Sequence, residues 1–244
     1  MKIMGQENAA TARTSTFDNF TYEGACDGFH SYIIRGKSQP YPRELKLVKK
    51  YLSKYPNKNN TYLDIGAHIG TTALPYSRLF KNVIAYEASA ENYKHLVNNI
   101  NFNKSSNIVA RNIGVSDTTT QAKVVKYGRN SGTWIMGPVD LKEDDPVNVI
   151  KLDDEEINNP VDFIKIDVEG SDLRVLKGAK ELIEKHKPLI QVETKTWLED
   201  ERQLFELNKF WSDDKQEIFN FMSNAGYKIF DDNGNDPLFY HKDM

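Results

Sequence analysis

Strand-type and helix-type segments alternate along the chain from residue 61 onward, and this alternation constrains the fold more than any other feature. Short apolar segments predict strands at 61–66, 82–87, 107–116, 161–167 and 188–193. Helical spacing of apolar residues predicts helices at 71–79, after Ser89, at 172–185 and at 214–225. Strands joined by helices of this length form right-handed crossovers. The chain is therefore predicted to be an α/β protein whose mostly parallel sheet carries helices on both faces.

The remaining segments complete this outline. Ser89 and Ser171 are placed to cap the helices that follow them. Segments 227–232 and 237–242 flank a turn at Asn233-Gly234-Asn235, which predicts a C-terminal hairpin with an antiparallel strand inserted at one edge of the sheet. Residues 121–151 are β-rich, with a turn between Gly128 and Gly132.

Two domains are expected: an N-terminal arm and helix at 1–58, acting as a cap over the substrate, and a catalytic domain at 59–244. Within the first, residues 1–16 are small and polar and predict a loosely packed arm, and a helix is predicted from Pro42.

Composition and charge narrow the class of protein. Hydrophobic residues make up 39% of the 244 residues, which is enough for a real core. With 32 Lys and Arg against 35 Asp and Glu, the net charge of -3 does not favour a binder of nucleic acid or of acidic membranes. Cys26 is the single cysteine, so no internal disulfide can form. No apolar run reaches membrane-spanning length and the first residues lack the apolar core of a secretion signal, so a cytoplasmic location is expected.

The first strand leads into Asp64-Ile65-Gly66-Ala67-His68-Ile69-Gly70, a turn suited to a ligand. Gly66 permits a tight turn and close approach of a ligand, and Gly70 lets the next helix pack closely. A dinucleotide fingerprint needs its last two glycines three residues apart, whereas these are four apart and Asp64 stands in place of the first glycine. Asp64 would repel a pyrophosphate but suits an ammonium or sulfonium group.

Glu87 ends the second strand, 23 residues after Asp64. An acid at this position can accept both hydroxyls of a ribose, although it could instead be an exposed strand-end carboxylate. The two acids together indicate a nucleoside that carries positive charge and no phosphate, which describes S-adenosylmethionine. Asp117 could accept a hydrogen bond from the adenine amino group, or it could be an ordinary turn aspartate.

A second acidic group follows the strand at 161–167. Asp167 ends this strand, Glu169 lies in the next loop, and Lys165 shares a face with Asp167 because side chains alternate along a strand. A lysine in an apolar strand needs a carboxylate partner, and Glu193 is the candidate. Asp167 and Glu169 could instead cap the following helix or form structural pairs. Two carboxylates could also hold a divalent metal, and that question stays open.

The motifs DIGAHIG, AYEASAENYKHLVNNINFN, RNIGVSD, VDFIKIDVEGSDLRVLKGA and KPLIQVE resemble, in order, those of FkbM-type S-adenosylmethionine-dependent methyltransferases. The resemblance covers residues 61–193, with weaker similarity to 230, and leaves residues 1–58 outside. It implies a class I methyltransferase, with a Rossmann-like, doubly wound sheet. It also implies O-methylation, which this family commonly performs on hydroxyls of sugars or polyketide-type products.

Carried over to this sequence, the resemblance assigns cofactor binding to seven residues: Asp64, Gly66, Ala67, Gly70, Glu87, Ala88 and Asp117. Two positions depart from the family pattern. His68 stands where Asn is usual and can alter contacts to the methionine end of the cofactor, and Ala88 replaces a frequent Pro.

The expected reaction is methyl transfer to a hydroxyl, on a saccharide or glycoconjugate. Amine methyltransferases commonly carry an Asn/Asp-Pro-Pro-aromatic loop where this chain has Asp-Val-Glu-Gly, which favours oxygen as the acceptor. A hydroxyl needs a base to take its proton. Asp167 is the first choice, Glu169 the second, and Lys165 would anchor the pair. The alternatives are a hydroxyl of a lipid or secondary metabolite, an NAD-dependent oxidoreductase, and a binding protein without activity.

Substrate selectivity is expected to come from the segments that cover the strand ends, at 17–43, 121–150 and 195–213. Acceptor contacts are predicted for Asn130, Ser131, Trp134 and Trp197. The tryptophans could instead serve simple loop packing. The acceptor is expected to be a small molecule or a glycan, with no nucleic-acid partner, and the oligomeric state stays open.

Overall fold

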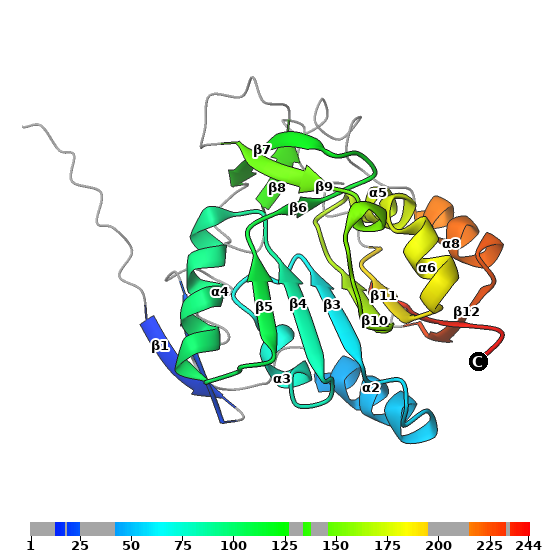
Figure 1. Cartoon of the computed structure of the whole chain (residues 1–244), viewed down its shortest axis with the longest axis horizontal. Coiled ribbons are helices and arrows are strands. Elements are labelled where there is room, and N and C mark those ends of the chain that lie inside the picture. Colours follow the sequence, from blue (N-terminus) through cyan, green and yellow to red (C-terminus); the bar gives the residue numbers. More distant parts are fainter. Residues whose placement is uncertain are drawn as a thin grey trace, which may run out of the picture.

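The computed structural model describes residues 13–17, 19–24, 42–126, 134–137, 146–194, 215–232 and 235–244 (Figure 1). Its centre is a seven-stranded sheet with the order β12-β13-β11-β10-β3-β4-β5. The strands are β3 (Thr61–Ile65), β4 (Asn82–Tyr86), β5 (Ile108–Arg111), β10 (Val161–Ile166), β11 (Leu189–Val192), β12 (Tyr227–Asp231) and β13 (Leu238–His241).

All neighbours from β5 to β11 run parallel, and β13 is antiparallel to both β11 and β12. The predicted α/β class and the antiparallel strand inserted by the C-terminal hairpin are therefore confirmed. The chain moves outward from β3 to β4 and β5 on one side, and from β10 to β11 on the other. The carboxyl ends of β3 and β10 thus flank the switch point, where such sheets bind ligands.

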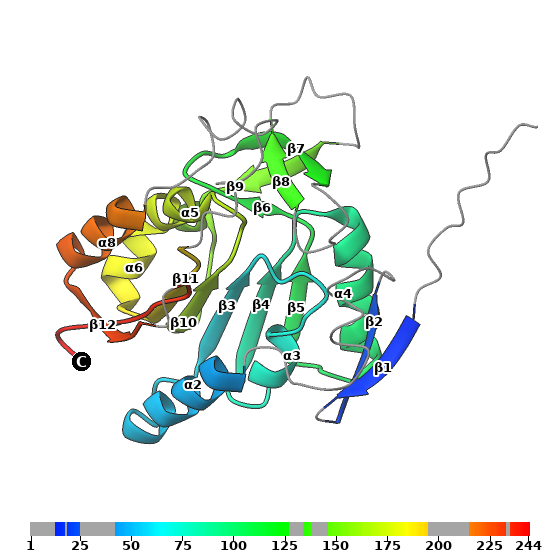
Figure 2. The ribbon, with the colours of Figure 1, turned by 180° about the vertical axis from the view of Figure 1, so that it is seen from behind.

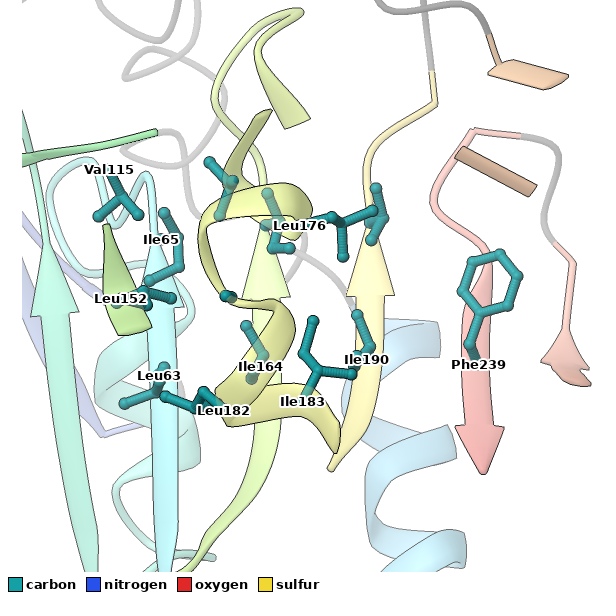
Figure 3. Packing of buried hydrophobic residues seen from close by; sticks show 14 of the residues in the cluster. Leu63, Ile65, Val115, Leu152, Ile164, Leu176, Leu182, Ile183, Ile190 and Phe239 are labelled. Atoms are coloured by element: carbon teal, nitrogen blue, oxygen red, sulfur yellow. The ribbon is translucent and has the colours of Figure 1, made fainter. Parts of the chain in front are cut away.

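Helices cover both faces of this sheet (Figures 1 and 2). On one face, Leu63, Ile164 and Ile190 belong to the core that packs under three helices (Figure 3). These helices are α5 (Asp172–Gly178), α6 (Lys180–His186) and α8 (Lys215–Asn224). On the other face, Tyr62 and Phe163 pack with three further helices. They are α2 (Pro42–Lys54), α3 (Ala73–Tyr76) and α4 (Ala90–Phe102).

Two predicted helices differ from the observed ones. Segment 71–79 is helical only over α3, and segment 172–185 is divided between α5 and α6 at Ala179. Ser89 caps α4 as predicted, because its Oγ accepts a hydrogen bond from the backbone N–H of Asn92 at 3.3 Å. Ser171 forms no side-chain cap. Asp172 instead accepts from the N–H groups of the preceding loop.

A second sheet, in the order β6-β9-β7-β8, lies beyond the carboxyl ends of β3, β4 and β5 (Figure 1). Its strands are β6 (Gly114–Val115), β7 (Thr120–Lys126), β8 (Trp134–Gly137) and β9 (Val147–Ile150). The β-rich character of 121–151 is confirmed in its described residues, and the turn predicted between Gly128 and Gly132 lies outside them. The single strand predicted at 107–116 is wrong, because the chain leaves the central sheet after Arg111 and enters the second sheet as β6. Ala88 packs against the apolar side of this second sheet.

The N-terminal part forms a hairpin of β1 (Arg13–Phe17) and β2 (Phe20–Gly24), which lies beside α4 (Figure 2). Residues 13–16 therefore belong to a strand and not to the loose arm predicted from their polarity. Within the described part of the chain, no helix combines the length and apolar character needed to cross a membrane.

Candidate active site

A buried polar row crosses three central strands near their carboxyl ends. Leu63 and Ile65 face α5 and α6, so Asp64 between them faces α2 and α4. The strand register places Lys165 beside Asp64 on one side and beside Gln191 on the other. All three side chains are buried. The face that is aromatic deeper in the sheet thus becomes polar where ligands bind.

Gly66 brings the loop after β3 against the loop after β10. Its φ of +81° is unfavourable for residues with a side chain, and a Cβ here would lie 1.8 Å from the carbonyl oxygen of Asp167. The N–H groups of Gly66 and Ala67 both donate to the carbonyl of Tyr86, at 3.0 and 2.9 Å. The close neighbour that demands glycine is therefore the loop after β10, whereas the sequence suggested an approaching ligand.

The sequence predicts that Gly70 lets the following helix pack closely, whereas the close neighbour lies in α4. A Cβ at this residue, whose φ is +90°, would lie 2.9 Å from Cδ1 of Leu96 in α4. Asp64 is tied to the same loop, because Thr72 Oγ1 donates to its Oδ2 at 2.6 Å. Burial raises the pKa of Asp64, and the charge of Lys165 opposes this rise.

Glu87 is the second anchor of this loop and is only 6% exposed. Its Oε2 accepts from the N–H of His68, and its Oε1 accepts from the N–H of Ser89, both at 2.8 Å. A side-chain hydrogen bond from Asn92 reaches the same carboxylate, so about one of its four acceptor positions remains for a hydroxyl such as that of a ribose. Asn112 holds the backbone of the same turn by donating to the carbonyls of Glu87 and Ala88.

Burial raises the pKa of Glu87 to about 7, against partial compensation by its backbone hydrogen bonds. Cofactor affinity is therefore expected to rise with pH, since the ionised carboxylate accepts stronger hydrogen bonds from hydroxyls than the neutral acid does. Calorimetry with S-adenosylhomocysteine should show a gain of several-fold, up to about tenfold, between pH 6 and pH 8. Without ligand, the same raised pKa should lower the stability of the fold as the pH increases from about 4.5 through 7.

Glu87→Gln is the matched control for this pH dependence. The amide keeps one acceptor oxygen but cannot ionise, so affinity should be lower and the increase between pH 6 and pH 8 should disappear. An unchanged affinity in this variant would show that Glu87 does not contact the cofactor.

Lys165 and Asp167 form the central ion pair of the second acidic group. Lys165 Nζ lies 2.7 Å from Asp167 Oδ2, and the lysine side chain is 4% exposed. The shared face predicted for these residues is confirmed. The carboxylate named as the lysine's partner was Glu193, whereas the ion pair seen is with Asp167. Glu193 joins the group through a hydrogen bond to Asp167.

The two acids of this hydrogen bond are shifted in opposite directions. Burial raises the pKa of Asp167, but the charge and hydrogen bond of Lys165 and the hydrogen bond from Glu193 outweigh it and lower the pKa. Burial, and then repulsion by Asp167 and Glu169, raise the pKa of Glu193 to about 11. At neutral pH the group therefore holds an ionised Asp167 beside a protonated Glu193.

Glu193 is a site residue whose role the sequence did not reveal. It follows β11, the strand next to β10, and lies two positions after the buried Gln191. The sequence feature that could have pointed to Glu193 is its position at the end of a strand, which matches the position of Asp167 on the neighbouring strand.

Glu169 completes the acidic group from a tight turn. Its φ is +56° and that of Gly170 is +98°. The carboxylate of Asp172 accepts from the N–H groups of Val168 and Gly170, at 3.2 and 3.1 Å, and so stabilises this turn. Three carboxylates offer oxygens that lie within 4.8 Å of one another: Asp167, Glu169 and Glu193. Such a group could hold a divalent cation, although Lys165 already supplies positive charge to Asp167.

Asp117 follows β6 and not a strand of the central sheet. Its Oδ1 accepts from Ser116 Oγ at 3.2 Å and lies 3.8 Å from Arg174 Nη1. Contact with adenine stays a prediction for this residue. Of the predicted acceptor contacts, Asn130, Ser131 and Trp197 lie outside the described residues. Trp134 begins β8, and its side chain lies outside the description.

The family model of the methyltransferase FkbM domain matches residues 64–229, which is more than half of the chain. The chain belongs to the FkbM methyltransferase family. The match begins at Asp64 and includes both the loop anchored by Glu87 and the acidic group around Asp167. These parts therefore correspond to the domain of a family of S-adenosylmethionine-dependent methyltransferases.

Solved structures show the same fold. Methyltransferase FkbM from Methylobacillus flagellatus is 23% identical with a TM-score of 0.48, over 75% of this chain and 44% of its own. This chain thus spans less than half the length of that protein. Monomeric WbdD is 12% identical, with a TM-score of 0.52, over 87% of this chain and 44% of its own.

A putative caffeoyl-CoA O-methyltransferase from Staphylococcus aureus is 13% identical with a TM-score of 0.51. The match covers 81% of this chain and 82% of that one. At such identities the similarities to WbdD and to the Staphylococcus aureus protein show the fold alone, and the class I methyltransferase fold predicted from the sequence is confirmed. No curated protein matches the sequence.

Proposed function

We propose that this protein transfers a methyl group from S-adenosylmethionine to a hydroxyl of a saccharide or glycoconjugate. The observation that carries the proposal is the carboxylate of Asp167. It is kept ionised by Lys165, and its backbone touches Gly66 of the cofactor loop. A proton acceptor therefore stands directly beside the place where the methyl donor would lie.

Residues of the two loops after β3 and β4 would hold the donor. Glu87 fits the ribose, because its carboxylate keeps acceptor capacity after the bonds from His68, Ser89 and Asn92. Asp64 adds negative charge that suits the cationic donor. The remaining contacts are proposed for Gly66, Ala67, Gly70, Ala88 and Asp117.

The donor, when bound, supplies an electrophilic methyl group on a sulfonium. Asp167 accepts a hydrogen bond from the acceptor hydroxyl and orients its oxygen toward that methyl group. As the carbon–oxygen bond forms and the carbon–sulfur bond breaks, the hydroxyl proton passes to Asp167. The products are a methyl ether and S-adenosylhomocysteine. Lys165 holds Asp167 in place, and the hydrogen bond from Glu193 further fixes the carboxylate.

The support for oxygen rather than nitrogen is the acidic character of this loop. An amine acceptor is held in many methyltransferases by carbonyls of a proline-rich loop, and this chain has Asp167-Val168-Glu169-Gly170 there. The second sheet packs on Ala88, beside the proposed ribose site, and so is placed to cover an acceptor. Contacts to a saccharide are proposed for Asn130, Ser131, Trp134 and Trp197.

The proposal is tested by transfer of a labelled methyl group to a panel of glycans, lipids, small alcohols and amines. A labelled methyl ether on a saccharide is the expected product. A labelled methyl ether on a lipid or secondary metabolite would show that the acceptor belongs to the alternative class. Labelled amines would contradict the oxygen chemistry, and thermal stabilisation by NAD but not by S-adenosylhomocysteine would contradict the cofactor.

A further inference from the structure

The N-terminal hairpin docks on α4 through two asparagine side chains. Phe17 pairs with Phe20, so the backbone groups of Thr21 and Glu23 face away from β1. The N–H of Thr21 donates to Asn103 Oδ1 at 2.7 Å, and Asn103 Nδ2 donates back to the carbonyl of Thr21 at 2.7 Å. Glu23 exchanges the same pair of bonds with Asn99, at 2.6 and 3.0 Å.

The side-chain amides of Asn99 and Asn103 take the place that the peptide groups of a third strand would have beside β2. A side-chain amide carries the same donor and acceptor as a peptide group, and Asn99 and Asn103 are one helical turn apart. Further contacts hold the hairpin on the body of the protein. Phe20 and Tyr22 are buried in the core beneath α4, and Glu23 Oε1 lies 3.0 Å from His95 Nδ1.

Asn99 differs from Asn103 by one additional bond. Its Nδ2 also donates to the carbonyl of Ile69 at 2.9 Å, and its side chain is fully buried. Ile69 lies between His68, whose N–H binds Glu87, and Gly70. Asn103 bonds to Thr21 and to the carbonyl of Asn99, and within the described part of the chain it makes no bond to this loop. The one amide thus joins the hairpin to the cofactor loop.

We propose that Asn99 is a positioning residue through which the docked hairpin supports the cofactor loop, so that hairpin docking and cofactor binding strengthen each other. The two hydrogens of its Nδ2 are shared between Glu23 and Ile69, and its Oδ1 is held by Glu23. When the hairpin leaves, two of these three bonds are lost and the amide is free to turn away from Ile69. Linkage requires the converse, that a loop fixed by cofactor keeps the hairpin docked. The inference rests on the proposed function, which places the cofactor on residues 66–70.

The first test compares Asn99→Ala with Asn103→Ala, its matched control at the C-cap of the same helix. Both variants lose two bonds to the hairpin, and only Asn99→Ala loses the bond to Ile69. Calorimetry should show an affinity for S-adenosylhomocysteine about tenfold lower in Asn99→Ala, the usual effect of losing a buried hydrogen bond. In Asn103→Ala the affinity should stay within about twofold, since the loop contact is kept. Equal losses in both variants, or none in Asn99→Ala, would overturn the proposal.

The second test uses the unmodified chain and does not depend on a variant that folds. Saturating S-adenosylhomocysteine should slow hydrogen exchange at the amides of Thr21 and Glu23 more than at Lys228 in β12, which lies at the opposite edge of the sheet. Equal slowing at all three amides would overturn the coupling. Neither test needs methyl transfer. Failure of the unmodified chain to bind would remove the proposed function together with this inference, whereas binding without coupling would remove only the inference.

Discussion

Asp167→Asn is expected to lower the rate of methyl transfer about a hundredfold or more, while the affinity for S-adenosylhomocysteine stays within a few-fold. Asparagine keeps the shape and one acceptor oxygen but cannot take the hydroxyl proton. The cofactor contacts proposed above come mainly from the loops after β3 and β4, so binding should be little affected. Single-turnover rates with a saturating acceptor and calorimetry with the product cofactor measure the two quantities separately.

The structure indicates that this substitution also lowers the stability of the fold, which the strand position of Asp167 alone did not reveal. Lys165 is only 3% exposed, so Asp167→Asn removes the carboxylate that lies 2.7 Å from a buried ammonium and leaves Asp64 as its charged neighbour. Breaking a buried pair from one side destabilises a protein by about 3–5 kcal/mol. Thermal unfolding should therefore show a clear loss of stability alongside the loss of activity.

Two controls separate these effects. The double variant Lys165→Met with Asp167→Asn removes the buried ammonium together with the carboxylate, so it should recover much of the stability and none of the activity. Glu169→Gln leaves the ion pair intact and should keep most of the rate. An active double variant would show that no base is needed at Asp167, and an inactive Glu169→Gln beside an active Asp167→Asn would exchange the two roles.

Gly66→Ala is expected to abolish cofactor binding and methyl transfer together and to destabilise the fold by several kcal/mol. The positive φ of this residue alone costs about 1–2 kcal/mol with a side chain present. The added Cβ would also meet the carbonyl oxygen of Asp167 at 1.8 Å, which is backbone and cannot rotate away. The loops after β3 and β10 would have to separate, and both sites depend on their contact. Urea unfolding and calorimetry measure the two losses.

Gly70→Ala is the matched control, because its φ of +90° carries a similar backbone cost. Its Cβ would meet the end of the Leu96 side chain at 2.9 Å, and a leucine can change rotamer. This variant should lose less stability and retain measurable cofactor binding. Equal losses in the two variants would show that the contact between Gly66 and Asp167 is not what requires glycine.

The local features of the site could be predicted from the sequence because each depends on a few adjacent residues. Apolar runs that end in an acid placed Asp64, Glu87 and Asp167 at strand ends, since parallel strands in α/β proteins end at one edge. Alternation along a strand placed Lys165 on the same face as Asp167. Ser89 could likewise be predicted as a helix cap, because a cap depends only on the residues next to it.

Features that depend on how distant segments of the chain are arranged in space were decided only by the tertiary structure. A continuous apolar pattern at 107–116 cannot show that the chain changes sheets after Arg111, because β5 and β6 have the same local character. Polarity at 13–16 suggested a loose arm, yet residues of α4 supply the missing hydrogen bonds to β2. The hydrogen bonds that Asn99 and Asn103 make to β2 can be recognised only once the hairpin and the helix lie side by side.

The amino-acid sequence by itself determined the fold class, the family and the strand-end positions of the acids, since these follow from periodicity and short motifs. Only the tertiary structure decided which acidic side chains are hydrogen-bonded to each other and which of them forms an ion pair with the lysine. Burial and the approach of β11 to β10 placed Glu193 beside Asp167, and close contact made Asp167, and not Glu193, the ion-pair partner of Lys165. Charges and pKa values depend on distances between residues far apart in the chain, and those distances exist only after the strands have assembled.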